Sequence, residues 1–294
     1  MNCWLKRLFV GILFCLAAAW IVLPIVGNHI VLPSMLQGKP EGILRPGASF
    51  EIVSLTTRDG VRIGAEFAPA ETNDGHPLPD AQRRPMLLYF YGAQRTLATP
   101  PTQSQIRYFR MMGVNVLMPD FPGYGMSGGS PSEPGFSAAA DAAYDYLLGR
   151  AGGEPGRILV GGSSRGAASA IDLASRRAVS GLVIMSGFTR MADFGYRYFP
   201  AAPRWLVRRL FSSVPLDNAA AIRRVTCPIL IIHGTVDPRV PFAMADELAA
   251  AAGGPVTRIK VPGAGHDDIG KVGGVKLWTG IRDWLAARDR LSGP

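Results

Sequence analysis

The spacing of two glycines around a serine constrains this chain more than any other sequence feature. The segment G-S-S-R-G at residues 162–166 follows an apolar run at residues 157–160 and precedes a helix-like segment at residues 167–173. A strand that turns directly into a helix at G-x-S-x-G is the nucleophile-elbow pattern. Side chains two residues before and after the serine would collide in so tight a turn, so both positions require glycine. The pattern predicts a strained turn that holds a serine hydroxyl at the edge of a sheet.

The two adjacent serines differ in their glycine neighbours. Ser164 has Gly162 two residues before it and Gly166 two residues after it, whereas Ser163 would have Arg165 in the second place. Ser164 is therefore the predicted nucleophile, with amide groups of the following helix start placed to bind a developing oxyanion. A chain with 35 glycines can also match this pattern by chance. An ordinary glycine-rich turn is the alternative unless the serine has partners.

The composition indicates a globular protein and argues against nucleic-acid binding. Of the 294 residues, 48% are hydrophobic and 18% charged, which suits one large or two small domains. The net charge is +9, but the basic residues form scattered pairs and no binding motif, so we expect no nucleic-acid partner. Cysteine and histidine spacings match no metal site, and we expect neither a metal nor an organic cofactor. Cys227 opens an apolar run and is expected to be an inert thiol.

The first 27 residues are predicted to form a transmembrane signal-anchor. Lys6 and Arg7 precede an uncharged run from Leu8 to Val26, which as a helix is about 28 Å long and crosses a hydrocarbon core. A cleaved signal peptide that yields a secreted protein is the alternative, because residues 17–19 are all alanine. We favour the retained anchor, since cleavage there leaves a strongly apolar terminus. The charge before the span predicts a single-pass protein with its catalytic domain outside the cytoplasm, periplasmic or extracellular.

Beyond a tether at residues 28–48, a single α/β domain is predicted over residues 49–294. We expect this domain to begin with a hairpin at residues 50–55 and 61–67. Six further strands are expected at residues 86–90, 114–118, 157–160, 181–185, 228–232 and 256–261. Helices are expected between and after them, at residues 102–112, 136–149, 167–173, 242–252 and 275–289. Continuous apolar strands separated by helices predict a mostly parallel sheet covered on both faces. Residues 189–216 interrupt this alternation with aromatics and arginines and are predicted to form a small helical cap.

Partners for the serine are expected where other strands end. Among four histidines, His266 lies on a glycine-rich loop after the last strand and can reach across the sheet edge as the base. Asp237 follows the preceding strand and is the predicted orienting carboxylate, with Asp246 a weaker alternative. His233, at the end of that strand, is expected to support the turn.

Residues 50–289 resemble the α/β-hydrolase superfamily. The elbow, the segment F-Y-G-A-Q at residues 90–94, the loop D-F-P-G-Y-G-M-S-G at residues 120–128 and the order serine, aspartate, histidine carry this resemblance. It implies an α/β-hydrolase fold with oxyanion donors at the backbone N–H groups of Ala93 and Arg165. Tyr91 stands where the family usually has histidine, and Pro122 where it usually has arginine. The nearest branch is serine aminopeptidase-like or acyl-protein-thioesterase-like, with a small cap and an N-terminal anchor.

These features together predict a membrane-anchored serine hydrolase. We expect Ser164, Asp237 and His266 to cleave a small-molecule or lipid acyl ester or thioester through an acyl-enzyme. A peptidase of the same fold and a catalytically silent binding protein are the alternatives. The arginines of the cap either face anionic lipid or simply lie in water beside aromatics packed on the core.

Overall fold

The computed structural model of the protein describes residues 3–26, 42–45, 47, 49–191, 193, 199–211 and 216–289. The chain divides into two compact units: residues 38–189 with 218–294, and residues 1–37 with 190–217. Most of the predicted tether at residues 28–48, and the cap aromatics at positions 194, 196 and 198, lie outside the described residues.

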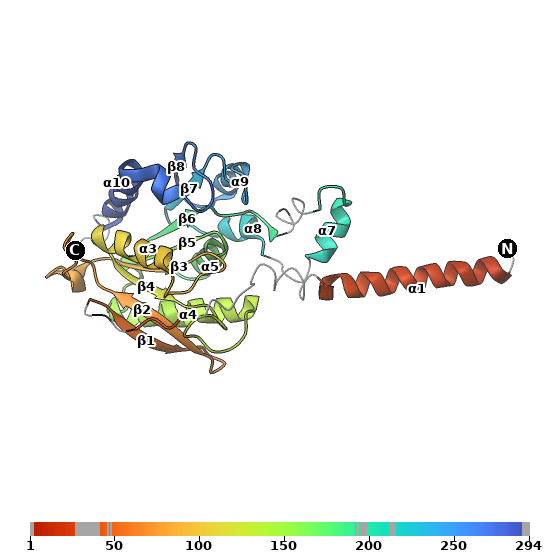
Figure 1. The fold of residues 1–294 in the computed structure, drawn as a ribbon, viewed down its shortest axis with the longest axis horizontal. Helices are drawn as coiled ribbons and strands as arrows, with labels where there is room; N and C mark the ends of the chain where they lie inside the picture. The colour runs from red at the N-terminus through yellow and green to blue at the C-terminus, as the bar shows by residue number, and fades with distance from the viewer. Residues whose placement is uncertain are drawn as a thin grey trace. The chain divides into compact units, whose positions relative to one another are not determined.

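The larger unit is organised around one eight-stranded sheet. Its strands are β1 (Glu51–Thr56), β2 (Arg62–Ala68), β3 (Met86–Phe90), β4 (Asn115–Pro119), β5 (Ile158–Ser163), β6 (Gly181–Met185), β7 (Ile229–Gly234) and β8 (Val256–Val261). Their order across the sheet is β1-β2-β4-β3-β5-β6-β7-β8, from bottom to top in Figure 1. The hairpin β1–β2 is antiparallel, β2 pairs antiparallel with β4, and the remaining neighbours are parallel. This confirms the predicted hairpin and mostly parallel sheet.

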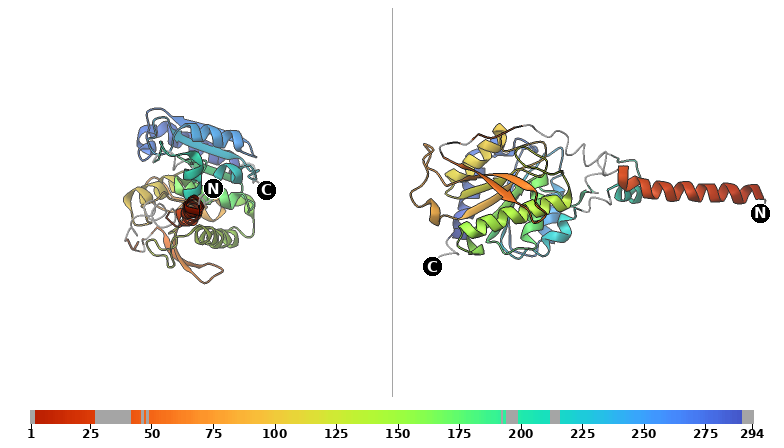
Figure 2. Two further views of the ribbon diagram at one scale, coloured as in Figure 1. Left: turned by 90° about the vertical axis from the view of Figure 1, so that its right-hand side faces the viewer. Right: turned by 90° about the horizontal axis from the view of Figure 1, so that it is seen from below.

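Helices cover both faces of the sheet (Figures 1 and 2). They are α3 (Pro100–Met111), α4 (Glu133–Arg150), α5 (Arg165–Ala174), α8 (Asn218–Ile222), α9 (Ala243–Ala251) and α10 (Ile269–Asp289), with short 3-10 helices η2 (Ala81–Arg83) and η3 (Pro155–Arg157). α4, α5, α8 and α9 pack side by side. On the other face Tyr108 of α3 stacks on Trp278 of α10, with ring centres 4.4 Å apart.

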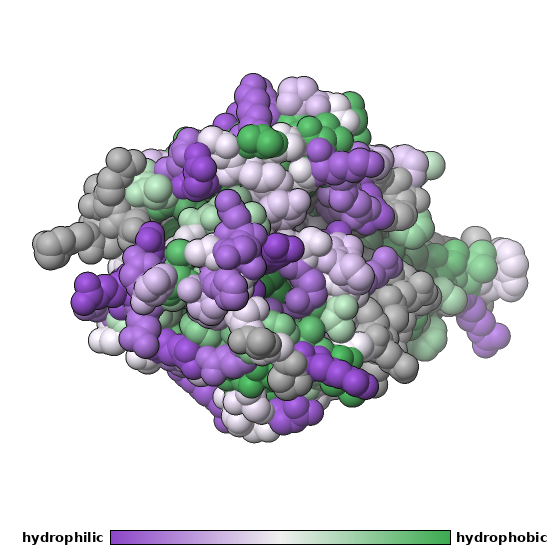
Figure 3. Space-filling model, turned by 60° about the vertical axis from the view of Figure 1, so that its left-hand side comes forward, coloured by the Kyte–Doolittle hydropathy of each residue, from purple (hydrophilic) through white to green (hydrophobic). Residues whose placement is uncertain are grey.

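Four of the six interior strands are buried along their whole length. Every residue of β3, β4, β6 and β7 is buried, whereas every residue of the edge strand β1 except Leu55 is exposed or half-buried. This difference in burial arises because helices cover both faces of the sheet over its interior strands but not over its edge strands. Outside this core, the face shown in Figure 3 is mostly hydrophilic, with hydrophobic residues in small groups.

Two helices begin three or more residues earlier than the sequence pattern predicts. α4 begins at Glu133, three residues before the predicted start, because the Ser132 hydroxyl accepts a hydrogen bond from the Gly135 N–H at 3.1 Å and caps the helix there. α10 begins at Ile269 and passes a kink at Gly274, where φ is +49°. The predicted helix at residues 275–289 is the part after this kink, which glycine tolerates because it lacks a Cβ.

The smaller unit contains two described helices. α1 (Cys3–Val26) includes Arg7–Ile25, a stretch of 19 residues that is long and apolar enough to cross a membrane and is not buried in the protein. A signal sequence has the same properties. α7 (Arg204–Leu210) is the helix of the predicted cap that the structure describes in full.

Candidate active site

Ser164 lies between the end of β5 and the start of α5 in a strained backbone conformation. Its φ of +53° and ψ of −119° are rare for any residue other than glycine. A Cβ on Gly162 would overlap the Gly166 carbonyl, and a Cβ on Gly166 would overlap the Phe90 carbonyl oxygen. The glycine spacing is therefore a steric requirement of this turn, and the strain falls on the predicted nucleophile.

The two serines of the elbow point to different surroundings. The Ser163 hydroxyl forms a hydrogen bond with the phenol of Tyr89, a fully buried residue of β3. Ser164 donates its backbone N–H to the Met185 carbonyl at 2.9 Å, and its side chain does not cap α5. Ser163 is thus bound to the core, while the conformation of Ser164 places it at the carboxyl edge of the sheet.

The segment after β3 passes close to Ser164. A Cβ placed on Gly92 would lie 3.5 Å from the Ser164 Cβ, so the adjacent Ala93, the predicted oxyanion donor, lies in the neighbouring part of the chain. The next residue, Gln94, has a φ of +60°. The segment therefore turns sharply beside the serine.

Tyr91 has a structural role in place of the histidine that is usual at its position. Its hydroxyl donates to Asp120 Oδ1 at 2.8 Å and accepts the Phe121 N–H at 3.2 Å. Asp120, which is buried, also accepts the N–H groups of Leu97 and Met126, both at 2.9 Å. Burial raises the pKa of Asp120 and holds the pKa of Tyr91 well above its ordinary value. Tyr91 and Asp120 thus join the segment after β3 to the loop after β4.

The structure brings Asp237 and His266 together. Asp237, after β7, places its Oδ2 2.7 Å from Nδ1 of His266, after β8. The other carboxylate oxygen accepts the N–H groups of Arg239 and Val240 at 2.8 Å each. Burial acts to raise the pKa of Asp237, but hydrogen bonds from His233, His266 and Val240 outweigh it, and the pKa lies well below its ordinary value. With Nδ1 held by a carboxylate, Nε2 of His266 is the ring nitrogen that can accept a proton.

Two other carboxylates that follow β7 and β8, Asp246 and Asp267, pair with arginines. Asp246, the weaker alternative to Asp237, pairs with Arg258. Asp267 pairs with Arg239 at 2.7 Å and lies 3.7 Å from Arg95. Asp267 therefore connects the loop of Asp237 to the segment that follows Ala93.

His233 has a contact that the sequence prediction did not include. Its Nε2 lies 2.9 Å from the Val240 carbonyl oxygen, which fits the expected support of the turn, and also 3.5 Å from Asp237 Oδ2. Its Nδ1 is buried without a hydrogen-bond partner among the described residues. A hydrogen on Nε2 is thus shared between the turn and the Asp237 carboxylate. The spacing of four residues between His233 and Asp237 is the signal that could have identified this contact.

The side chain of Arg165 is a second feature that sequence reasoning missed. It is 6% exposed, and its guanidinium carbon lies 3.7 Å from the ring centre of Phe121 and 4.5 Å from that of Phe136. None of its guanidinium nitrogens has a hydrogen-bond partner within the described part of the chain. Burial lowers the pKa of this guanidinium. A cation in an aromatic cage thus directly follows Ser164 in the chain.

Other features of the larger unit are separate from this edge of the sheet. A groove of about 680 Å³ is lined by residues that include Phe67, Met86, Asn115 and Arg150. Met86 and Asn115 begin β3 and β4, so the groove lies at the amino ends of the parallel strands, opposite Ser164. Burial raises the pKa of the Cys227 thiol to about 11, as expected of an unreactive cysteine. The described residues contain no group of three or more His, Cys, Asp or Glu side chains arranged to hold a metal ion.

Several solved structures share this architecture. The Pyrococcus furiosus esterase Pf2001 superimposes with a TM-score of 0.66 over 84% of this chain and 96% of its own, at 20% identity. A puromycin-hydrolyzing peptidase of Mycobacterium tuberculosis gives a TM-score of 0.62 at 16% identity, over 83% of this chain and 40% of its own. At these identities the likeness shows the fold, an eight-stranded α/β-hydrolase sheet.

Sequence comparisons give the family. The uncharacterized protein Rv2307c of Mycobacterium tuberculosis is 38% identical over 236 residues, which cover 79% of this chain and 78% of that protein. Alpha/beta hydrolase domain-containing protein 17B of Homo sapiens is 34% identical over 155 residues, 53% of this chain and 51% of its own. The model of the alpha/beta hydrolase family matches residues 101–215. By sequence and by fold, this chain belongs to the alpha/beta hydrolase family.

Proposed function

We propose that this protein is a serine hydrolase that cleaves a carboxylic ester or thioester through an acyl-enzyme on Ser164. The observation that carries the proposal is the 2.7 Å hydrogen bond between Asp237 and His266, formed after β7 and β8 at the sheet edge where β5 ends in the strained Ser164. A nucleophile, a base and an orienting carboxylate are the groups that acyl transfer by a serine requires.

In the proposed first half-reaction, Nε2 of His266 takes the Ser164 proton as the serine oxygen attacks the substrate carbonyl carbon. The N–H groups of Ala93 and Arg165 donate hydrogen bonds to the oxyanion that forms. The intermediate then collapses: the bond to the alcohol or thiol breaks, and His266 returns the proton to that leaving group. In the second half-reaction His266 takes a proton from water, water attacks the acyl-enzyme, and the proton returns to Ser164 as the carboxylic acid leaves.

Asp237 supports both half-reactions through its charge and position. Its lowered pKa keeps the carboxylate ionised near neutral pH, and an ionised carboxylate stabilises the imidazolium that His266 becomes in each transition state. The backbone N–H groups of Arg239 and Val240 hold its other oxygen, so the carboxylate cannot turn away from the ring.

We further propose that residues 1–27 anchor the protein in a membrane as a single-pass helix, with a tether at residues 28–48 and the catalytic domain at residues 49–294 on the outer side. The 19-residue apolar stretch Arg7–Ile25 supports this topology, and the positive charge before it supports the sidedness. Detecting the intact N-terminus in the membrane fraction would support the anchor. Recovery of a shortened, secreted protein would instead favour signal cleavage.

Labelling with a fluorophosphonate probe, which reacts with activated serines, tests the chemistry. We expect the wild type and Ser163→Ala to label and Ser164→Ala not to label. Ser163→Ala is the matched control because its hydroxyl forms a hydrogen bond with Tyr89 in the core. A wild type that does not label contradicts the proposal and favours a silent binding protein. Faster cleavage of aminoacyl amides than of p-nitrophenyl esters by a protein that labels favours the peptidase alternative.

A further inference from the structure

The smaller unit holds a short cationic helix against the apolar helix α1. The rings of Trp205 on α7 and Trp20 on α1 stack with centres 6.4 Å apart and planes 25° apart. Arg209, one turn after Trp205, has its guanidinium carbon 4.5 Å from the centre of the Trp20 ring. Residues one turn apart share a helix face, so the face of α7 that carries Trp205 and Arg209 packs against Trp20.

Arg209 also contacts a backbone carbonyl that the sequence of α1 leaves without its usual partner. In an α-helix the carbonyl of Trp20 accepts the N–H of the residue four positions later, which here is Pro24. Proline has no N–H, so this carbonyl loses its intrahelical bond. Arg209 Nε and Nη2 donate to it at 2.9 and 2.7 Å. Within a membrane an unsatisfied backbone carbonyl is unfavourable, because no water is there to bond it, and the guanidinium supplies the missing donor.

The position of this contact along α1 corresponds to a membrane interface. Trp20 lies five residues before Ile25, the last residue of the apolar stretch, and hence about 7 Å from its end. Tryptophan is enriched at this depth, where an apolar ring meets headgroups. Interfacial helices place their apolar faces about 5–10 Å into the same boundary. If α1 spans a bilayer, α7 is held at its surface.

The remaining side chains of α7 suit such a surface. Trp205 is 60% exposed, and nearby in the chain Phe199 is 44% exposed. Arg204 and Arg208 share a second face of α7 and are exposed. The basic charge of α7 thus lies beside exposed aromatic rings.

We propose that α7 docks on the surface of the bilayer that α1 spans, at an anionic lipid headgroup layer. Trp205 enters the boundary of the acyl chains, Arg204 and Arg208 contact lipid phosphates, and Arg209 bonds the Trp20 carbonyl. Long arginine side chains reach from an apolar boundary to charged headgroups in this way. The inference rests on the proposed membrane anchor and is independent of the chemistry at Ser164.

The depth of α7 can be measured in the full-length chain in nanodiscs that contain phosphatidylglycerol and phosphatidylcholine. An environment-sensitive NBD fluorophore is attached at Trp205→Cys after the native cysteines are replaced by serine. We expect blue-shifted emission and several-fold stronger quenching by doxyl-labelled lipid than at Val275→Cys, an 83% exposed position of the larger unit. A label on Cys15 alone, with the other cysteines replaced, reports on α1. Quenching at Cys15 with water-like emission at Trp205→Cys overturns the docking of α7 but leaves the anchor standing. Water-like emission at both positions overturns the anchor and the docking together.

Charge reversal separates headgroup binding from simple proximity. Arg204→Glu with Arg208→Glu is expected to abolish most of the quenching at Trp205→Cys, because glutamate is repelled by phosphatidylglycerol. The matched control is Arg223→Glu with Arg224→Glu, a pair of exposed arginines in the larger unit, which is expected to leave the quenching unchanged. Equal quenching in both double variants overturns the proposed contact with anionic headgroups.

Discussion

The larger unit contains two clusters in which carboxylates meet basic side chains, and they differ in burial. In the Asp237 cluster, formed with His233 and His266, the carboxylate side chain is 0% exposed. In the Asp141 cluster, formed mainly with Arg176 and Arg177, the carboxylate is 19% exposed and the arginines 35% and 23% exposed. The Asp141–Arg176 contact at 3.0 Å and the Asp237–His266 contact at 2.7 Å are similar in length, so burial and partner type are what separate the two clusters.

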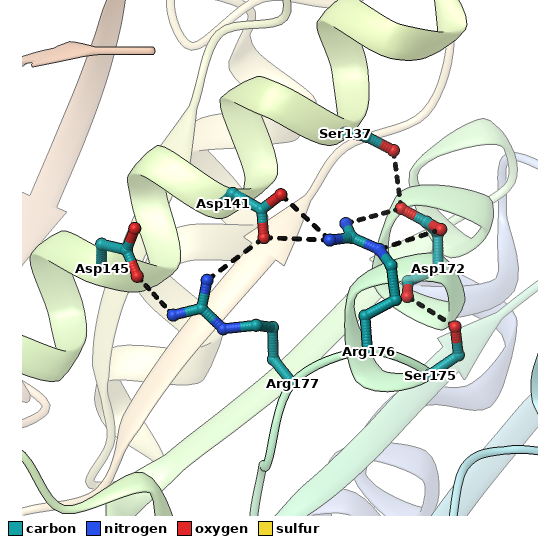
Figure 4. Close-up of polar contacts among 7 residues, drawn as sticks. All are labelled: Ser137, Asp141, Asp145, Asp172, Ser175, Arg176 and Arg177. Atoms are coloured by element: carbon teal, nitrogen blue, oxygen red, sulfur yellow. Dashed lines mark hydrogen bonds and ion pairs between the residues drawn. The ribbon is translucent and has the colours of Figure 1, made fainter. Parts of the chain in front are cut away.

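The Asp141 cluster joins α4 to the end of α5 (Figure 4). Asp141 on α4 lies 3.0 Å from Arg176 and 3.3 Å from Arg177. Arg176 also lies 2.9 Å from Asp172 of α5, which accepts the Ser137 hydroxyl at 2.7 Å. Further along α4, Asp145 pairs with Arg177. Each of these carboxylates has at least one permanently charged or hydroxyl partner.

The difference in burial determines what each cluster contributes to fold stability and to catalysis. Water and salt weaken an exposed ion pair to about 0–1 kcal/mol, so the Asp141 cluster is expected to aid helix packing only modestly. A buried carboxylate is costly to leave without partners, so the Asp237 cluster depends on every hydrogen bond that it makes. The ring nitrogens of its histidine partners can both accept and donate a proton, whereas an arginine guanidinium cannot be deprotonated in a protein, which makes the same geometry suitable for proton transfer.

Asp237→Asn should have the largest effect. The amide keeps the shape of the side chain but presents the wrong hydrogen-bonding groups to the His266 ring, and we expect kcat to fall about 10⁴-fold. Hydrolysis of a p-nitrophenyl ester measures the change. Asp141→Asn is the matched control and should leave kcat unchanged. Comparable losses of activity in the two variants, each folded by circular dichroism, would contradict the distinction between the clusters.

His233→Phe should have an intermediate effect and separates positioning from packing. Phenylalanine fills the site but donates no hydrogen bond to Asp237. Removing a hydrogen bond to a charged group costs about 1.5–3 kcal/mol, which corresponds to a kcat about 10- to 100-fold lower. His233→Gln, whose amide nitrogen can take the place of Nε2, should restore most of the activity. Equal losses in both variants would indicate a packing role alone.

The pH dependence of stability gives His233→Phe a second readout. In the wild type the folded-state pKa of Asp237 is lowered, so its ionisation stabilises the fold above the ordinary aspartate pKa, and this contribution is lost as pH falls through the lowered folded-state value. Without the His233 hydrogen bond the folded-state pKa of Asp237 rises towards its ordinary value, so the loss of stability in acid should still begin near the ordinary aspartate pKa but should be smaller and end at higher pH. Urea unfolding across a pH series measures the shift. Superimposable wild-type and variant curves would argue against the contact with Asp237.

Features that depend on residues close together in the chain could be predicted from the sequence. β3 and β6 have their predicted bounds, because continuous apolar runs mark strands that are buried on both faces. β8 also has its predicted bounds, although it is the partly exposed edge strand. The glycine spacing that singled out Ser164 reflects a steric clash within five residues. Asp237 and His266 were predicted because parallel strands end at one edge of a sheet. Their catalytic roles and the oxyanion donors stay predictions until labelling and kinetics test them.

Contacts between distant parts of the chain could not be predicted in the same way. Tyr91 bonds Asp120, 29 residues away, and no local pattern identifies that pairing. The aromatic cage of Arg165 draws rings from two other segments. Arg209 and Trp20 are 189 residues apart, although Pro24 marks the carbonyl that needs a donor. Side-chain packing decides such pairings, and hydrophobic periodicity carries no information about them.

Arg176→Gln should have the smallest effect and completes the comparison. It removes the guanidinium that joins Asp141 to Asp172, and we expect the free energy of unfolding to fall by less than about 1 kcal/mol. The loss should shrink further in 1 M salt, where the screening length is only about 3 Å. Arg58→Gln is the control, because Arg58 is exposed in the β1–β2 turn, where no ion pair to it is found among the described residues. Urea unfolding at low and high salt measures both variants. A larger loss in the free energy of unfolding for Arg176→Gln that does not change with salt would contradict this expectation. It would mean that the Asp141 cluster stabilises the fold as a buried ion pair does, because only a desolvated charge pair escapes screening by mobile ions.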